Sequence, residues 1–214
     1  MTYLYHIKRP ETVTEETPIL VTLHGMGSNY HDLSAIAGKQ SADYIQIDVQ
    51  GNRPWQSGYT YYVPNFSSVP EEHVILETLD ALMQFLKETY QKEKLSENQP
   101  LYFLGFSQGA ILSLCLGILY PQRVSGAVIL SGRLPQFVTE KLDQTSAKPS
   151  FFIGQGQFDP LFPLPIGRAL HQFLTENGYA TFYHEYATSH GVNGEELVAV
   201  QQWLTSAFNG KLQS

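Results

Sequence analysis

The chain is poor in cysteine and in basic side chains. Its single cysteine, Cys115, excludes a disulfide within the chain and a zinc site built from several cysteines. Thirteen Lys and Arg residues face twenty Asp and Glu residues, which gives a net charge of −7. Because a nucleic-acid binder needs surplus positive charge for the phosphates, we expect no nucleic-acid partner.

Long apolar runs are also missing. No run approaches the 18 or more apolar residues of a membrane-spanning helix, and the first residues show no basic start followed by an apolar stretch. We therefore expect a cytoplasmic protein without a membrane span. The length of 214 residues fits one domain, covering residues 1–214. Composition leaves the oligomeric state open, and a homodimer is one option.

Short apolar runs alternate with helical patterns along most of the chain. Runs that are apolar on both faces are typical of buried parallel strands. We expect strands at 19–23, 44–47, 101–104, 128–130, 150–153 and 181–186, and helices at 71–90, 109–120, 163–177 and 193–208. This order predicts an α/β fold with a mostly parallel central sheet and helices on both faces. Residues 2–7 are expected to add an antiparallel edge strand.

Residues 51–70 interrupt this alternation. They contain three prolines and five aromatic residues, and they follow neither the helical nor the strand period. We expect a long loop here, and long loops in compact domains are usually functional.

A serine lies where a strand is expected to turn into a helix. Residues 105–109 read Gly-Phe-Ser-Gln-Gly, between the apolar run 101–104 and the helical pattern that follows. A sharp strand-to-helix turn holds a hydroxyl clear of the backbone, and glycines beside it allow close backbone approach or a positive φ. Ser107 is therefore the candidate nucleophile.

A serine hydroxyl needs a base, and the base needs an orienting carboxylate. Asp159 follows the expected strand 150–153 through a glycine-bearing loop. An Asx turn before Pro160 is the alternative interpretation of Asp159. Of the seven histidines, His190 alone lies both on an expected loop and downstream of Asp159. The order Ser107, Asp159, His190 is the one in which these groups occur on strand-following loops of α/β enzymes.

The oxyanion formed by serine attack needs preorganised N–H donors. Residues 23–27, Leu-His-Gly-Met-Gly, follow the first buried strand and form a glycine-lined loop. We predict that the backbone N–H groups of Met26 and Gln108 form the oxyanion hole.

A metal site is the alternative to this chemistry. His24, His31 and Asp32 lie close in sequence, but their spacing matches no common ligand pattern, and no His-Glu-x-x-His motif occurs. We expect no metal and no cofactor.

Four motifs together resemble one known family. They are Leu-His-Gly-Met-Gly, Gly-Phe-Ser-Gln-Gly, Phe-Asp-Pro-Leu-Phe-Pro and Ser-His-Gly, and the resemblance spans roughly residues 18–205. It is to the phospholipase/carboxylesterase family of α/β-hydrolases, which includes acyl-protein thioesterases. The resemblance implies the α/β-hydrolase fold and a lightly covered serine esterase. The chain departs from the family at Ala110, where members often have glycine, and at Ser28, where they often have aspartate.

Residues 58–62, Gly-Tyr-Thr-Tyr-Tyr, resemble a loop of some bacterial esterases in this family. On this resemblance, Trp55, Tyr59, Tyr61 and Tyr62 would line the acyl or alcohol pocket. The alternative is that these aromatic side chains fix the loop to the core.

The predicted function is hydrolysis of small to medium carboxylic esters through an acyl-enzyme, with a small-molecule ester as substrate. The same groups could serve an acyl thioesterase or a small serine peptidase. A ligand-binding protein on the same fold is the non-enzymatic alternative, because fold alone does not specify function.

Overall fold

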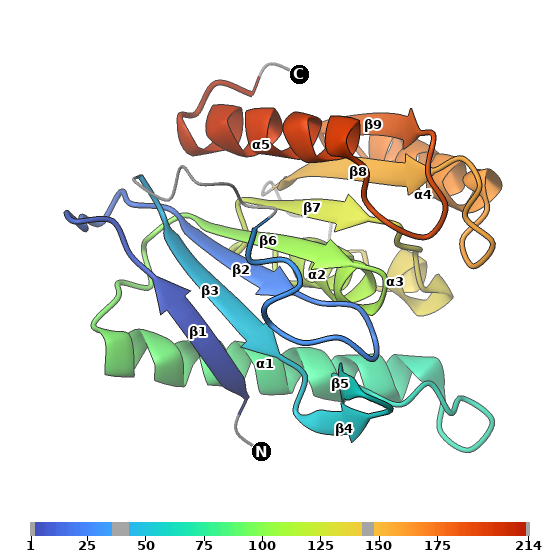
Figure 1. Ribbon diagram of the computed structural model, residues 1–214, viewed down its shortest axis with the longest axis horizontal. Helices are drawn as coiled ribbons and strands as arrows, with labels where there is room; N and C mark the ends of the chain where they lie inside the picture. The colour runs from blue at the N-terminus through green and yellow to red at the C-terminus, as the bar shows by residue number, and fades with distance from the viewer. Residues whose placement is uncertain (1–2, 36–42, 143–147, 213–214) are drawn as a thin grey trace.

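The computed structural model describes residues 3–35, 43–142 and 148–212. A seven-stranded sheet forms its centre, with the order β1-β3-β2-β6-β7-β8-β9 (Figure 1). The strands are β1 (Leu4–Lys8), β2 (Ile19–Leu23), β3 (Ile45–Gln50), β6 (Leu101–Phe106), β7 (Gly126–Leu130), β8 (Ser150–Gly156) and β9 (Thr181–Tyr186). β1 pairs with β3 antiparallel, and the other neighbours in this sheet are parallel. The mostly parallel sheet with an antiparallel N-terminal edge strand is confirmed, although Thr2 lies outside the described residues.

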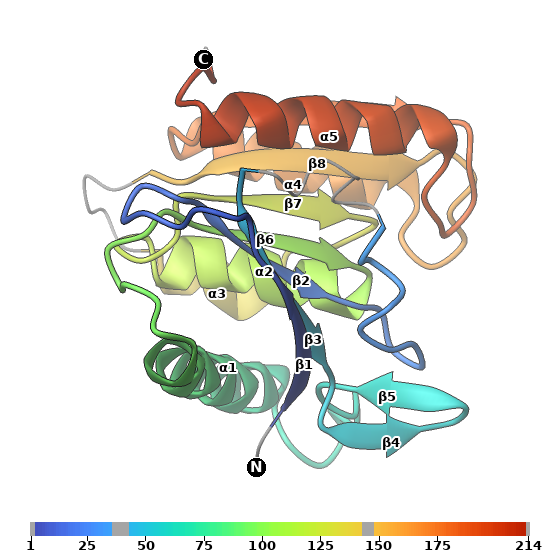
Figure 2. The same ribbon diagram turned by 60° about the vertical axis from the view of Figure 1, so that its left-hand side comes forward.

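Both faces of the sheet are covered by helices. Every residue of β2, β3 and β7 is buried, so neither face of these strands can remain open to water. The helices are α1 (Glu71–Glu93), α2 (Gln108–Leu119), α3 (Gln136–Glu140), α4 (Leu164–Glu176) and α5 (Gly194–Phe208). Side chains of α1 to α4 belong to one core cluster, and side chains of α5 belong to a second. Figure 2 shows α1 and α5 on opposite sides of the sheet.

The prediction of a structureless loop over 51–70 is wrong for its first half. Two short strands, β4 (Arg53–Trp55) and β5 (Gly58–Thr60), pair antiparallel in a hairpin. Each is three residues long, too short to show an alternating pattern. Contacts with a distant loop fix the hairpin, because Tyr59 exchanges backbone hydrogen bonds with Gly27 and Ser28. The short helix α3 was also not expected from the sequence.

The parallel strands bring the candidate site together. β2, β6, β8 and β9 run in the same direction, so the loops that follow them lie along one edge of the sheet. These loops carry the glycine-lined segment 24–28, Ser107, Asp159 and His190. Within the described segments, no helix is both long and apolar enough to cross a bilayer.

Candidate active site

Ser107 occupies the turn between β6 and α2 with φ 53° and ψ −112°, a conformation that non-glycine residues rarely adopt. The sequence pattern allowed a positive φ at the flanking glycines, but the serine itself carries it. The glycines serve close backbone approach: a Cβ on Gly109 would lie 1.8 Å from the Leu23 carbonyl oxygen, and one on Gly105 would lie 2.1 Å from that of Gly109. The turn therefore requires both glycines.

Asp159 lies in the turn after β8 and is 4% exposed. Its Oδ1 accepts hydrogen bonds from the N–H groups of Leu161, at 2.8 Å, and Phe162, at 2.9 Å. Burial alone would raise the pKa of Asp159, but the N–H of Phe162, the imidazole of His190 and the N–H of Leu161 outweigh it and lower this pKa. The carboxylate is thus held in its charged form. The Asx-turn interpretation is also correct, because Oδ1 accepts the N–H groups of the turn that follows while Oδ2 faces His190.

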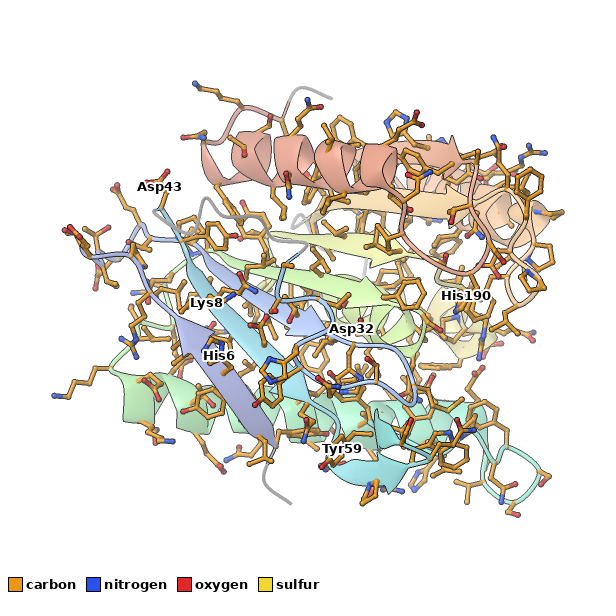
Figure 3. The ribbon with its side chains drawn as sticks, viewed as in Figure 1. His6, Lys8, Asp32, Asp43, Tyr59 and His190 are labelled. Atoms are coloured by element: carbon orange, nitrogen blue, oxygen red, sulfur yellow. The ribbon has the colours of Figure 1, made fainter. Side chains whose placement is uncertain are left out.

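His190 joins the carboxylate to the hydroxyl. Its Nδ1 lies 2.7 Å from Asp159 Oδ2, and its Nε2 lies 3.0 Å from Ser107 Oγ. A carboxylate only accepts hydrogen bonds, so Nδ1 carries the ring proton and Nε2 presents its lone pair to the serine hydroxyl. The rings of Phe106 and Phe162 pack against the imidazole, with centroids 4.9 and 5.7 Å away. Figure 3 labels His190 beyond the carboxyl ends of the central strands.

The two predicted oxyanion donors lie on either side of the serine turn. Gln108 is the first residue of α2, where a helix leaves its N–H groups without a partner in the helix. Met26 lies in the loop after β2. Among the described residues, neither backbone N–H donates to a protein acceptor. Both N–H groups are therefore free to bind a developing negative oxygen.

His24 has a structural place in the loop after β2. It is buried, its Nδ1–H donates to the Gly25 carbonyl oxygen at 2.7 Å, and its Nε2 accepts from the Gly51 N–H at 2.9 Å. Burial lowers the pKa of His24, which keeps it neutral. Both ring nitrogens are occupied by backbone groups. No three His, Cys, Asp or Glu side chains in segments 3–35, 43–142 and 148–212 could hold a metal ion.

The four aromatic pocket candidates separate into two pairs. Tyr61 and Tyr62 are 1% and 3% exposed, and the Tyr61 hydroxyl donates to the Val49 carbonyl oxygen at 2.7 Å. For this pair the core-anchoring interpretation, which the sequence left open, describes the structure. Trp55 and Tyr59 are half-buried on the β4–β5 hairpin and remain candidates for a pocket wall.

Sequence reasoning missed two side chains beside the serine turn. The side-chain amide of Gln108 is bonded to residues 60–62, and one of its partners is the buried Thr60 hydroxyl. From the sequence, only the backbone N–H of Gln108 was expected to have a role. The glutamine in Gly-Phe-Ser-Gln-Gly was the available signal for a side-chain role, because the turn itself needs only the glycines and the serine.

The described sheet, with a serine at the turn after its central strand β6 and helices on both faces, is the α/β-hydrolase fold. Residues 7–207 match the model of the phospholipase/carboxylesterase family. The chain belongs to this family.

Relatives in sequence carry related names. The chain is 23% identical to the putative hydrolase MhqD of Bacillus subtilis over 192 residues, which cover 89% of the chain and 94% of the relative. It is 30% identical over 107 residues to a probable carboxylesterase of Oryza sativa, covering 49% of the chain and 40% of the relative. It is 28% identical over 116 residues to acyl-protein thioesterase 1 of Saccharomyces cerevisiae, covering 53% of the chain and 50% of the relative. The matches to the rice protein and to a probable carboxylesterase of Arabidopsis thaliana span less than half of those relatives' length.

Solved structures share the fold. The carboxylesterase of Bacillus cereus superposes with a TM-score of 0.83 at 21% identity, over 96% of this chain and 94% of that one. Esterase PE8 superposes with the same TM-score at 18% identity, over 97% of this chain and 100% of that one. At such identities the likeness concerns the fold alone.

Proposed function

We propose that this chain is a serine hydrolase that cleaves carboxylic esters through an acyl-enzyme. The observation that carries the proposal is the hydrogen-bonded series from Ser107 Oγ to His190 Nε2 and from His190 Nδ1 to Asp159 Oδ2. Membership of the phospholipase/carboxylesterase family supports the same reaction class.

The reaction would follow from this geometry. Ser107 Oγ attacks the ester carbonyl carbon while its proton passes to His190 Nε2, and Asp159 stabilises the imidazolium. The N–H groups of Met26 and Gln108 bind the oxygen that becomes negative. His190 then gives the proton to the leaving alcohol, which leaves an acyl group on Ser107. A water molecule, deprotonated by His190, attacks the acyl carbon, and collapse returns the proton to Ser107 and releases the acid.

Exposed apolar side chains favour a substrate with an apolar part. Met26 is 43% exposed on the loop that supplies an oxyanion donor, and Phe158 and Leu161 are 71% and 62% exposed on either side of Asp159. Small-molecule sites are lined mostly by apolar side chains, and these three lie on the loops that carry the proposed catalytic groups. A small to medium ester with an apolar acyl or alcohol group fits this surface.

Labelling with a fluorophosphonate tests the nucleophile. We expect one covalent adduct per chain, on Ser107, and loss of both adduct and esterase activity in Ser107→Ala. Ser28→Ala is the matched control, because Ser28 lies in the neighbouring loop and, among the residues that the structure describes, its hydroxyl bonds to Asp32 alone. A folded wild-type protein that stays unlabelled, or a Ser107→Ala variant with full activity, would contradict the proposal.

The pH dependence tests the base. A protonated imidazole cannot accept the proton of Ser107, so we expect kcat/KM to be lower at acidic pH than at pH 8. The measurement is ester hydrolysis from pH 5 to 8, with stability checked at each pH. A flat profile with chemistry rate-limiting would count against His190 as the base.

A thioesterase is the second candidate, favoured by the match to an acyl-protein thioesterase of Saccharomyces cerevisiae. Matched ester, thioester and anilide substrates with one acyl group separate the esterase, thioesterase and peptidase alternatives through their kcat/KM values. Ligand binding without an acyl-enzyme burst for any of the three would favour the non-enzymatic alternative.

A further inference from the structure

We propose that residues 51–62, called the clamp, position the two oxyanion donors, and that the side chains of Gln108 and Thr60 are positioning residues of the site. The inference rests on the proposed function, because it concerns how the same site is held in its working geometry. It assigns a role to a segment whose hairpin the sequence did not reveal.

The clamp contacts the serine turn through hydrogen bonds to one buried side chain, that of Gln108. Gln108 is 5% exposed, and its Oε1 accepts from the Thr60 hydroxyl at 2.8 Å and from the Tyr61 N–H at 2.9 Å. Its Nε2 donates to the Tyr62 carbonyl oxygen at 2.9 Å. The Tyr61 N–H can only donate and the Tyr62 carbonyl can only accept, so only one orientation of the amide satisfies both backbone partners. The side chain is thus fixed, and the backbone N–H of the same residue is fixed with it.

The clamp also holds the loop that carries the other donor. The Gly27 N–H donates to the Tyr59 carbonyl oxygen at 2.8 Å, and the Tyr59 N–H donates to the Ser28 carbonyl oxygen at 2.8 Å. These bonds begin at the residue that follows Met26. Gly58 permits this pairing, because a Cβ on it would lie 2.2 Å from the Gly27 carbonyl oxygen.

The start of that loop is attached to the same segment. The His24 N–H donates to the Tyr61 hydroxyl at 3.2 Å, and His24 Nε2 accepts from the Gly51 N–H. Met26 therefore lies between two points of attachment, His24 before it and Gly27 after it. One segment thus holds both sides of the predicted oxyanion hole.

Loss of this arrangement should lower kcat more than it raises KM. An oxyanion hole works by donors placed in advance around the oxygen of the transition state, and a misplacement of about 1 Å can cost about 100-fold. Loosening the clamp would let the N–H of Gln108 move relative to that of Met26. The ground-state ester, which has little charge on its oxygen, would lose much less.

The experiment compares two glutamines whose side chains are similarly buried and hydrogen-bonded. Gln108→Met keeps the backbone N–H and the side-chain length but removes the three hydrogen bonds. Gln99→Met is the matched control. Gln99 is 4% exposed, and its side chain makes three hydrogen bonds, to Ser96, Thr14 and Thr17. It lies just before the start of β6, at the end of the strand away from Ser107. We expect Gln108→Met to lower kcat about 10- to 100-fold with KM within about threefold, and Gln99→Met to change neither. Equal kcat in Gln108→Met and wild type, or equal losses in both variants, would overturn the inference.

A milder variant keeps the test decisive where Gln108→Met fails to fold. Thr60→Val removes, at nearly constant shape, a hydroxyl whose one proton is shared between Gln108 Oε1, at 2.8 Å, and the Tyr62 carbonyl oxygen, at 2.6 Å. We expect about a 3- to 10-fold fall in kcat. Because the two side chains act through one contact, the double variant should fall no further than Gln108→Met alone. Fully multiplicative effects would argue against a shared clamp.

Amide hydrogen exchange separates this inference from the proposed function. The Gly27 N–H, bonded to Tyr59, should exchange faster in Gln108→Met or Thr60→Val than in wild type or Gln99→Met. A wild-type protein without hydrolytic activity would refute the proposed function and leave this readout valid. Unchanged Gly27 exchange in both clamp variants would overturn the clamp, whatever the activity of the wild-type protein.

Discussion

At the scale of single residues, Ser107, the proposed nucleophile, carries the backbone strain of its own turn. A non-glycine residue in a sparsely populated backbone region costs about 1–3 kcal/mol, and surrounding structure must hold it there. The Ser107 N–H donates to the Leu130 carbonyl oxygen at 2.9 Å, and its carbonyl oxygen accepts from the Ile111 N–H at 3.1 Å. Strain and compensating bonds together place the hydroxyl at the end of β6, facing His190.

Asp159→Asn should greatly reduce catalysis and leave the fold intact. An asparagine keeps one oxygen for the N–H groups of Leu161 and Phe162 and turns its NH₂ toward His190. Nδ1 must then accept, so the ring proton moves to Nε2, which can no longer take the proton of Ser107. We expect kcat to fall about 10³- to 10⁴-fold with little change in Tm, measured by ester hydrolysis and thermal unfolding. A variant with more than a tenth of wild-type kcat would argue against this role for Asp159.

A buried carboxyl outside the candidate site makes stability depend on pH. Glu196 on α5 is 1% exposed, and burial raises its pKa from 4.5 to about 7. The folded state therefore binds the proton more tightly than the unfolded state does. The free energy of unfolding should be highest below pH 4.5 with respect to this group, fall as the pH rises to about 7, and then level off.

Glu196→Gln removes this titration. Because the amide stays neutral, we expect the free energy of unfolding at pH 8 to rise by roughly 3 kcal/mol, with a flatter profile from pH 5 to 8. Urea unfolding at several pH values measures it. Glu195→Gln, at the exposed neighbouring position, is the control and should change little. An unaltered pH profile in Glu196→Gln would mean that Glu196 is not the titrating group.

At the scale of elements, the β4–β5 hairpin is held by its neighbours. It is a two-stranded sheet of three-residue strands, too small to be stable alone. Its stability comes from the loop after β2, through Gly27 and Ser28, and from Gln108 at the start of α2, which lies within hydrogen-bond distance of the Thr60 hydroxyl. The hairpin thus depends on the same residues whose positions it fixes.

Gly58→Ala tests the fit of this element. The added methyl group would lie 2.2 and 2.6 Å from the carbonyl oxygens of Gly27 and Ser28, so the backbone must shift. We expect a loss of about 1–3 kcal/mol in stability and at least a tenfold loss of kcat. Gly194→Ala, where an added Cβ meets nothing within 4 Å, is the control and should leave both quantities unchanged or raise stability. Wild-type kcat in Gly58→Ala would contradict the tight pairing.

At the scale of the whole molecule, the two faces of the sheet are packed unequally. α1 to α4 contribute to the larger cluster, while α5 supplies the helical side chains of the smaller one. Trp203 is the largest of these, 5% exposed, with ring centroids 6.3 Å from Phe152 and 6.4 Å from Phe182. Because α5 follows the loop of His190 directly, this packing also supports the end of the site.

Trp203→Ala should therefore destabilise the whole fold. Removing a buried aromatic side chain leaves a cavity and costs about 3–5 kcal/mol. Trp55→Ala, at the chain's other tryptophan, is the control, because Trp55 is only half-buried on the hairpin and its loss should cost much less. Urea unfolding measures both. Equal losses in the two variants would show that α5 is not a principal support of the fold.

The sequence alone determined which segments form the strands of the central sheet, four of the helices, and the loops on which Ser107, Asp159 and His190 lie. These features leave local signals: burial sets the period of apolar residues, and each site residue follows its own strand. Only the tertiary structure decided that residues 53–60 form a hairpin, that Tyr61 and Tyr62 lie in the core, and that the Gln108 amide holds them. Those features depend on contacts between segments far apart in the chain, and such contacts leave no period in the sequence of either segment.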